Sequence, residues 1–251
     1  MLTVAILTHN NSETIGQTIH DLAWSNEVLI IDDNSTDSTV QRAQKAGARV
    51  IIHDLKNNFA AARMLAMDEA KNDWIFFLDT DERLDAAAVS SIKKINLHSV
   101  QEAGFRIHRV DYFWNRRITH GEVRSASHQG LIRLIHRTRG EWVGKVHERF
   151  VPTGSVGTLL GAIEHRSHRS ISDFLDKINY YSDIRAAELQ DQSRVRTIIE
   201  MIIFPPGKFI STYIFRLGLL DGAVGFVYSF MMSFHSFLVR AKILTRYSKY
   251  L

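Results

Sequence analysis

The chain of 251 residues contains no cysteine. It therefore has no disulfide framework, no thiolate metal site and no cysteine nucleophile, which fits a reducing compartment. Residues 1–10 form a strand-like run and lack the basic segment with which a secretory signal begins, so we expect no such signal. Internal repeats and low-complexity segments are also absent. The length suits one large domain or two small ones.

Two glycine-rich phosphate-binding motifs are missing as well. Neither Gly-x-Gly-x-x-Gly nor Gly-x-x-x-x-Gly-Lys follows a predicted strand. Their absence argues against a dinucleotide-dependent dehydrogenase and a P-loop nucleoside triphosphatase. A nucleotidyltransferase would need a glycine-rich, basic loop after the first strand to hold a triphosphate. Residues 8–12 contain neither a glycine nor a basic residue, so this class is also disfavoured.

The sequence does contain a regular alternation of strand-like and helix-like segments. The predicted strands are residues 2–7, 28–31, 49–53 and 74–78, and the predicted helices are 13–23, 38–46, 59–71 and 86–97. Ser12 is expected to cap the first helix. This spacing predicts an α/β fold with a Rossmann-like, mostly parallel sheet flanked by helices. Further strands at 104–110, 131–135 and 141–146, then a helix starting after Ser170, indicate a mixed-sheet region and a helical tail.

Asp79 and Asp81 directly follow the most apolar predicted strand, Trp74–Leu78. Five consecutive apolar residues are typical of a strand buried on both faces. Ligands of open α/β sheets bind at the carboxyl ends of such strands. Two carboxylates at that edge offer oxygen ligands for Mg²⁺ or Mn²⁺, ions that commonly bridge to substrate phosphates. We therefore expect a metal–diphosphate site, with a solvated acidic turn or a helix cap as the alternative.

The carboxy-terminal tail is basic and apolar. Eight Lys or Arg and two acidic residues lie between Arg194 and Leu251, so the tail carries a net charge of +6 in a chain of only +4. Gly222–Val239 and Ile198–Phe204 are apolar, and Pro205-Pro206-Gly207 is expected to break the helix between them. The charge favours contact with an anionic membrane surface over nucleic-acid binding. The glycines, serines and flanking basic residues favour helices that lie in the membrane interface, or that re-enter it, over a full crossing. Helices packed on the soluble domain are the alternative.

Four motifs occur in order across residues 4–82: Val4–Asn10, Ile31–Asp37, Asn58–Arg63 and Phe77–Glu82. Together they resemble the inverting family 2 glycosyltransferases of the GT-A fold. Shorter stretches are similar to the branch that includes lipopolysaccharide core β-glucosyltransferases; these are residues 104–107, 120–121, 132–134, 146–149 and 220–222. The resemblance implies a nucleotide-sugar donor, in this family mostly a UDP-sugar, and a glycolipid or saccharide acceptor.

The resemblance also implies roles for individual residues. Those expected to bind the nucleotide-sugar are Thr8, Asn10, Glu13, Asp33, Arg63 and Asp79. Those expected to hold the Mn²⁺ or Mg²⁺ ion are Asp79, Asp81 and, as a third ligand, His165. Asp32 and Asp37 are expected to shape the turn and cap the next helix.

An inverting transfer needs a carboxylate base that takes the proton of the acceptor hydroxyl. The family often places this base in a Glu-Asp element, but here the matching residues read Val146-His147-Glu148-Arg149. Glu148 is the candidate base, with His147 or Arg149 to orient it, and a surface Glu–Arg pair is the alternative. Asp111 and Glu122 are fallback bases.

We therefore expect three regions. Residues 1–97 form the nucleotide-sugar-binding half, 98–168 the acceptor-facing half of the same domain, and 169–251 a membrane-associating tail. The expected enzyme is cytoplasmic and peripherally bound at the inner face of the cytoplasmic membrane. Alternatives are a glycosyltransferase acting on a protein or soluble saccharide, and a non-catalytic nucleotide-sugar-binding domain.

Overall fold

The computed structural model describes residues 1–56, 58–145, 148–168, 170–189 and 192–247. It consists of two compact units. Met1–Arg109 and Gly130–His165 form the first unit, and Val110–Gln129 and Arg166–Leu251 form the second. This division differs from the three expected regions because the segment Val110–Gln129 clusters with the carboxy-terminal helices.

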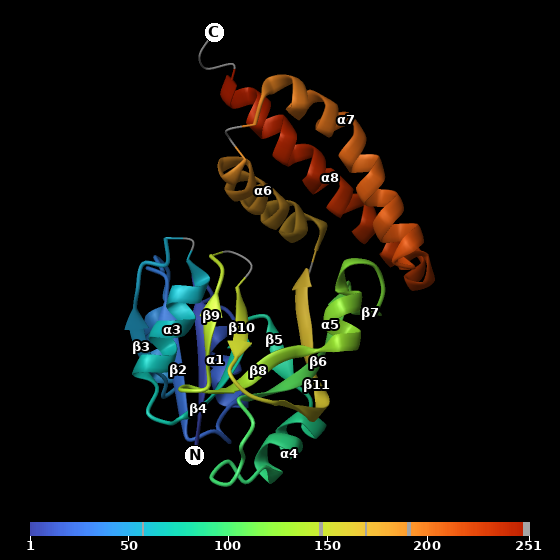
Figure 1. The fold of residues 1–251 in the computed structure, drawn as a ribbon. Helices are drawn as coiled ribbons and strands as arrows, with labels where there is room; N and C mark the ends of the chain where they lie inside the picture. Colours follow the sequence, from blue (N-terminus) through green and yellow to red (C-terminus); the bar gives the residue numbers. More distant parts are fainter. Residues whose placement is uncertain (57, 146–147, 169, 190–191, 248–251) are drawn as a thin grey trace. The chain divides into compact units, whose positions relative to one another are not determined.

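The first unit is built on a mixed sheet with the strand order β3-β2-β1-β4-β8-β6-β11-β5 (Figure 1). Its strands are β1 (Leu2–Thr8), β2 (Glu27–Asp32), β3 (Arg49–Ile52), β4 (Trp74–Asp79), β5 (Glu82–Leu84), β6 (Gly104–Phe113), β8 (Leu131–His136) and β11 (Val156–His168). The four strands β3-β2-β1-β4 are parallel. From β8 onward the pairings of β8 with β4 and β6, and of β11 with β5, are antiparallel, so the sheet is mixed. A separate ribbon pairs β9 (Gly140–Val143) with β10 (Arg149–Pro152).

Helices cover both faces of this sheet. They are α1 (Ile15–Asp21), α2 (Thr39–Lys45), α3 (Phe59–Glu69) and α4 (Ala86–Lys94). Alternate residues of β1 point to opposite faces, so that Val4 and Ile6 join the core under α1 and α4 while Ala5 joins the core under α3. The predicted α/β fold is confirmed.

The expected cap of α1 is wrong. The helix begins only at Ile15, and its N-cap is Thr14. The backbone N–H of Ser12 instead donates to Asp37 Oδ2 at 3.1 Å. Asp32 accepts the N–H of Ser35 at 2.8 Å and shapes this turn as expected. Asp37 also accepts the N–H of Thr39 at 2.9 Å, but the N-cap of α2 is Ser38, so the expectation that Asp37 caps this helix is wrong.

The second unit is mainly helical. Its elements are the end of β6, β7 (Arg116–Ile118), a 3₁₀ turn η1 (Gly121–Val123), α5 (Arg124–Gln129), α6 (Ile171–Glu188), α7 (Arg194–Ile210), a π-helical turn η2 (Ser211–Phe215), a 3₁₀ turn η3 (Gly218–Asp221) and α8 (Gly222–Tyr247). Ser170 caps α6 by accepting the N–H of Asp173. Aromatic rings of Phe113, Phe174 and Tyr228 meet in its core, which therefore joins β6, α6 and α8.

The expected helix break at Pro205 and Pro206 is also wrong, because α7 runs through both prolines. Each proline removes one backbone donor from the helix. Packing along α8 offsets this loss, and the Ser233 hydroxyl of α8 donates to the carbonyl of Pro205 at 2.7 Å.

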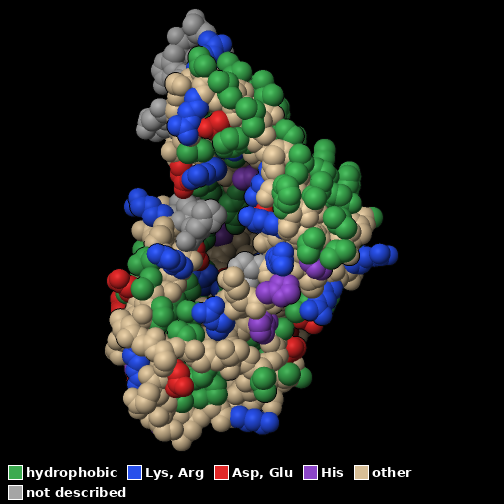
Figure 2. Space-filling model, turned by 45° about the vertical axis from the view of Figure 1, so that its right-hand side comes forward, with side chains coloured by type: hydrophobic (Ala, Val, Ile, Leu, Met, Phe, Trp, Pro, Cys, Tyr) green, Lys and Arg blue, Asp and Glu red, His purple; other side chains and the backbone are tan. Residues whose placement is uncertain are grey.

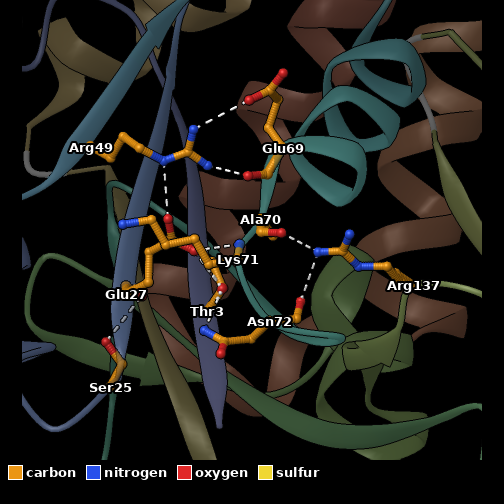
Figure 3. A network of polar contacts seen from close by, with 9 residues as sticks. All are labelled: Thr3, Ser25, Glu27, Arg49, Glu69, Ala70, Lys71, Asn72 and Arg137. Carbon is orange, nitrogen blue, oxygen red and sulfur yellow. Dashed lines mark hydrogen bonds and ion pairs between the residues drawn. The ribbon is translucent and has the colours of Figure 1, made fainter.

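Glu27 joins three segments at the edge of the sheet opposite the strand ends that carry the motifs (Figure 3). Its carboxylate accepts the Thr3 hydroxyl at 2.7 Å, the Lys71 N–H at 2.8 Å and the Arg49 Nε at 3.0 Å. Burial alone would raise the pKa of Glu27, but these hydrogen bonds and the Arg49 charge outweigh it and lower the pKa below its ordinary value.

We predict that Glu27→Gln lowers the free energy of unfolding by about 2–3 kcal/mol, because it removes a charge that three donors share. Since the folded-state pKa is lowered, this contribution is complete above the unfolded-state pKa and is lost as the pH falls through the folded-state value. Urea unfolding at several pH values measures it. Glu69→Gln, at a half-exposed carboxylate that also pairs with Arg49, is the control and should cost less than about 1 kcal/mol. Equal losses for the two variants would contradict the assignment.

Candidate active site

The carboxyl end of β4 lies at the centre of the sheet. Its parallel neighbour is β1, where Leu7 pairs with Asp79, and Thr8 of β1 in turn pairs with Asp32 of β2. The ends of these three strands therefore bring Thr8, Asp33 and Asp79 to one edge. On its other side β4 meets the antiparallel strand β8. The expected strand buried on both faces is confirmed, because Trp74–Leu78 are all buried.

Two buried arginines hold the carboxylate of Asp79. Arg63 of α3 donates from Nη2 to Oδ1 at 3.3 Å, and Arg133 of β8 donates from Nη2 to Oδ2 at 2.9 Å. Burial alone would raise the pKa of the Asp79 carboxyl, but the charges of Arg133 and Arg63 outweigh it and hold the pKa well below its ordinary value. Asp79 is therefore a permanent anion at this edge.

Glu82 contacts both Arg133 and the backbone of Asp79. Its Oε1 accepts from Arg133 at 2.6 Å, and its Oε2 accepts the backbone N–H of Asp79 at 3.0 Å. The side chain is fully buried, and burial together with repulsion from Asp79 raises the pKa of its carboxyl despite the charge of Arg133. Glu82 thus fixes both the Asp79 backbone and the guanidinium that holds the Asp79 side chain.

Arg63 joins this cluster to the candidate base. Its Nε donates to Glu148 Oε1 at 2.9 Å, while its guanidinium lies over the rings of Trp142 and Phe77, 4.8 and 5.2 Å from their centroids. Nη1 of this buried side chain has no hydrogen-bond partner among the described residues. Two carboxylates and two aromatic rings thus fix the guanidinium in place, while its Nη1 donor is unused. This donor can bind an anionic ligand.

Asp81 lies next to the predicted third metal ligand. His165 of β11 places Nε2 3.5 Å from Asp81 Oδ1, and β11 pairs with β5 at this point through the register His165↔Glu82. Within the described residues, no group of three or more His, Asp or Glu side chains is close enough to hold a metal ion. Asp79 does not complete such a group here, since both of its oxygens accept from arginines.

The other predicted donor-binding residues are in the neighbouring loops. Asp33 accepts the Leu55 N–H on Oδ1 at 2.9 Å, and its own N–H donates to the carbonyl of Thr8. Asn10 has a left-handed backbone and bridges to the next loop by accepting the Thr36 N–H at 2.8 Å. Glu13 is exposed in the turn before α1, and the described part of the chain provides no contact between it and the cluster.

The alternatives for the base have other partners. Asp111 and Glu122 belong to the second unit, where the Glu122 carboxylate pairs with Lys208 and Arg216. His147, one of the two expected orienting residues, lies outside the described residues, and Glu148 pairs with Arg63.

Sequence reasoning missed Arg133, Glu82 and Trp142 as parts of this site. Arg133 stands in a short stretch that carries the family resemblance, yet nothing in the sequence pairs it with Asp79, 54 residues away. A lone basic residue inside the apolar run Leu131–Ile135 was the available signal, because such a charge must find a partner when the strand is buried.

Comparison with known proteins gives consistent results. Residues 3–95 match the model of Glycosyl transferase family 2. The chain is 29% identical over 255 residues to the lipopolysaccharide core biosynthesis glycosyltransferase LpsC of Rhizobium meliloti, covering 98% of this chain and 93% of that protein. It is also 27% identical over 261 residues to an uncharacterized glycosyltransferase of Rickettsia typhi, covering 95% of this chain and 85% of the relative.

Two solved structures align with the chain at lower sequence identity. Staphylococcus aureus TarS aligns with 79% of this chain and 42% of its own, with 14% identity and a TM-score of 0.47. Glucosyl-3-phosphoglycerate synthase of Mycobacterium tuberculosis, crystallised with Mn²⁺ and UDP, aligns with 45% of this chain and 43% of its own, with 19% identity and a TM-score of 0.34. At this level of similarity the two structures say nothing about individual residues of the chain.

We predict that Arg133→Met lowers the free energy of unfolding by about 3–5 kcal/mol, because Glu82 then remains buried without its cation. The double variant Arg133→Met/Glu82→Gln removes that uncompensated charge and should recover a large part of the loss. Urea denaturation of the wild type, both single variants and the double variant forms a complete cycle. Strictly additive losses would show that the two side chains do not depend on each other.

Proposed function

Because the chain is a family 2 glycosyltransferase, we propose that it moves a sugar from a nucleotide-sugar, with inversion at the anomeric carbon, to an acceptor of the lipopolysaccharide type. Similarity to LpsC over nearly the whole chain supports this acceptor class. UDP is the proposed nucleotide. The observation that carries the proposal is the Arg63 guanidinium, which binds the donor-side Asp79 and the candidate base Glu148 at once.

The donor would bind along the ends of β1, β2 and β4. Thr8 and Asp33 would hold the base, with Asp33 Oδ2 accepting a ring N–H, while Asn10 and Glu13 would line the same edge. Asp79, fixed as an anion by two arginines, would accept from the ribose hydroxyls. The unused Nη1 donor of Arg63 would face the negatively charged diphosphate side of the donor.

Charge balance supports a divalent cation at this site. Among the described residues, ion pairs join the four carboxyl groups of Asp79, Asp81, Glu82 and Glu148 to two guanidinium groups, those of Arg63 and Arg133, and to the imidazole of His165. Asp81 and His165 already lie side by side and offer an oxygen and a nitrogen ligand that suit Mn²⁺, with Mg²⁺ as the alternative. We assign the ion to these two residues, so that Asp79 is not a ligand. When bound, it would neutralise the charge of the leaving diphosphate.

In the transfer step, the oxygen of an acceptor hydroxyl forms a bond to the anomeric carbon from the face opposite the diphosphate. The Glu148 carboxylate takes the hydroxyl proton as this bond forms. The bond between the anomeric carbon and the diphosphate oxygen breaks, and the nucleoside diphosphate leaves with the electron pair. Arg63 holds Oε1 of Glu148, which leaves Oε2 as the proton-accepting atom.

A second reading is a nucleotide-sugar-binding domain without turnover. The ion pair between Glu148 and Arg63 favours it, because the guanidinium already occupies one oxygen of the carboxylate, Oε1. A protein or a soluble saccharide is the alternative acceptor for an active enzyme. Activity toward these acceptors, compared with that toward a lipid-linked saccharide, separates the readings.

The proposed location is the cytoplasmic face of the membrane, with peripheral attachment. Two helical segments, Arg194–Phe215 and Gly218–Thr245, are long and apolar enough to cross a bilayer. This composition supports contact with a membrane, where a lipid-linked acceptor would be presented.

We predict that Asp81→Asn lowers the Mn²⁺-dependent affinity for UDP at least about tenfold, because it removes a charged metal ligand. Isothermal titration with UDP, with and without Mn²⁺, measures the effect. Asp68→Asn, at an exposed aspartate of α3, is the matched control and should bind as the wild type does. An unchanged metal dependence in Asp81→Asn would remove Asp81 from the metal site.

We predict that Glu148→Gln lowers the turnover number about 10²–10⁴-fold while UDP affinity stays near that of the wild type, since the amide keeps the shape but cannot take the proton. Steady-state transfer assays and UDP titration together measure this. Glu141→Gln, at an exposed glutamate of β9, is the control. A wild-type protein that binds donor but transfers to none of the three acceptor types would favour the non-catalytic reading.

A further inference from the structure

One face of the α7–α8 hairpin is apolar and exposed. Along α7 the exposed residues recur at helical spacing, and Val195 and Ile202 have 69% and 66% of their surface accessible. Only 11% of the most apolar 18 residues within Arg194–Phe215 are buried. Hydrophobic side chains crowd the surface of this helical part (Figure 2). The further members of this apolar face are Ile198, Ile199, Ile203, Ile210, Ile214, Phe226 and Phe230.

The opposite side of α7 carries charges that are already paired. Glu200 is buried and pairs with Arg196 one turn away at 2.8 Å and with Arg240 of α8 at 3.4 Å. Lys208 pairs with Glu122 at 3.0 Å. The hairpin is therefore amphipathic along its whole length rather than apolar all round, which is the pattern of a helix that lies in a membrane interface.

The turn between α7 and α8, residues 211–221, is tied to the polar segment 116–124. Asp221 accepts the N–H groups of Thr119 at 3.2 Å and His120 at 2.9 Å. The N–H of Gly121 donates to the carbonyl of Arg216 at 2.9 Å, and Glu122 accepts from the Arg216 guanidinium at 3.1 Å. All these contacts lie within the second unit.

These contacts between the turn and residues 116–124 bear on whether the α7–α8 hairpin lies in the membrane interface or crosses the bilayer. A crossing hairpin would carry its turn to the far side of the bilayer, and the segment 116–124 would have to follow. That segment contains Arg116, Arg117 and Arg124, all exposed. Each arginine is costly to place in the hydrocarbon, so the attached turn opposes crossing although α8 alone is long enough for it.

We propose that the α7–α8 hairpin is an in-plane anchor, seated in one leaflet of an anionic membrane through its apolar face and the turn residues Phe215 and Leu220. This inference rests on the membrane contact proposed above and specifies which residues enter the lipid. The arginines at the turn and at the start of α7 lie at headgroup depth, where anionic lipids attract them. A second copy of the chain is a less favourable partner for this apolar face, because the two tails, each with a net charge of +6, would repel each other.

The absence of cysteine makes the test direct, since any introduced cysteine is the only labelling site. Ile202→Cys on the apolar face, Leu220→Cys in the turn and Asp176→Cys on the exposed side of α6 are labelled with an environment-sensitive fluorophore. Each full-length protein is added to sealed vesicles of phosphatidylcholine and phosphatidylglycerol. We expect blue-shifted emission and quenching by shallow brominated lipids at positions 202 and 220, and no change at 176.

A membrane-impermeant quencher trapped inside the vesicles distinguishes the two topologies. It should leave the label at position 220 unquenched; quenching from the lumen would show a crossing hairpin and overturn the inference. Vesicle binding without a shift at position 202 would show that another surface makes the contact. Concentration-dependent self-association without vesicle binding would assign the face to a second copy.

A charge on the apolar face gives an independent readout. Ile199→Glu/Ile202→Glu should lower partitioning into these vesicles at least about tenfold while circular dichroism stays unchanged. Transfer to a soluble saccharide acceptor should be retained, so that loss of anchoring and loss of the proposed transferase activity are separate results. Unchanged partitioning of this variant would contradict the proposed face.

Discussion

The proposed site depends on the two ion pairs that Arg63 and Arg133 form with the Asp79 carboxylate. They join three elements that meet only in the folded chain: α3, the parallel strand β4 and the antiparallel strand β8. β4 and β8 are the strands at which the parallel half of the sheet meets the antiparallel half, and the ion pair between Asp79 and Arg133 joins them. Because Arg63 also pairs with Glu148, it links the proposed donor-binding edge to the candidate base.

The excess of carboxyl groups is the feature that supports the proposed metal site in this cluster. Both oxygens of Asp79 accept from arginines, whereas Asp81 faces a histidine. Two adjacent aspartates of one motif thus receive different environments and different proposed tasks, one as a fixed anion and one as a metal ligand. The raised pKa of Glu82 follows from the same crowding of negative charge under burial.

The amino-terminal half of the fold could be predicted well from the sequence, because hydrophobic runs that end in polar motifs mark parallel strands and their carboxyl ends. The run Trp74–Leu78, which ends at Asp79, is one such case, and it forms the buried strand β4. The partners of Asp79 could not be predicted, since Arg133 comes from an antiparallel strand whose register depends on tertiary packing. The expected helix break at Pro205 and Pro206 is wrong for a related reason. Contacts of α7 with α8 outweigh the tendency of proline to end a helix. The tail also covers residues 110–129, which composition alone did not indicate.

The most direct test of the division of tasks between Asp79 and Asp81 is a crystal structure of the protein grown with UDP and Mn²⁺, with diffraction data collected at the manganese absorption edge. The account predicts one anomalous peak bound by Asp81 and His165 beside the diphosphate, with Asp79 still held by Arg63 and Arg133. A manganese ion bound to Asp79 with either arginine displaced, or a diphosphate bound elsewhere on the chain, would contradict it.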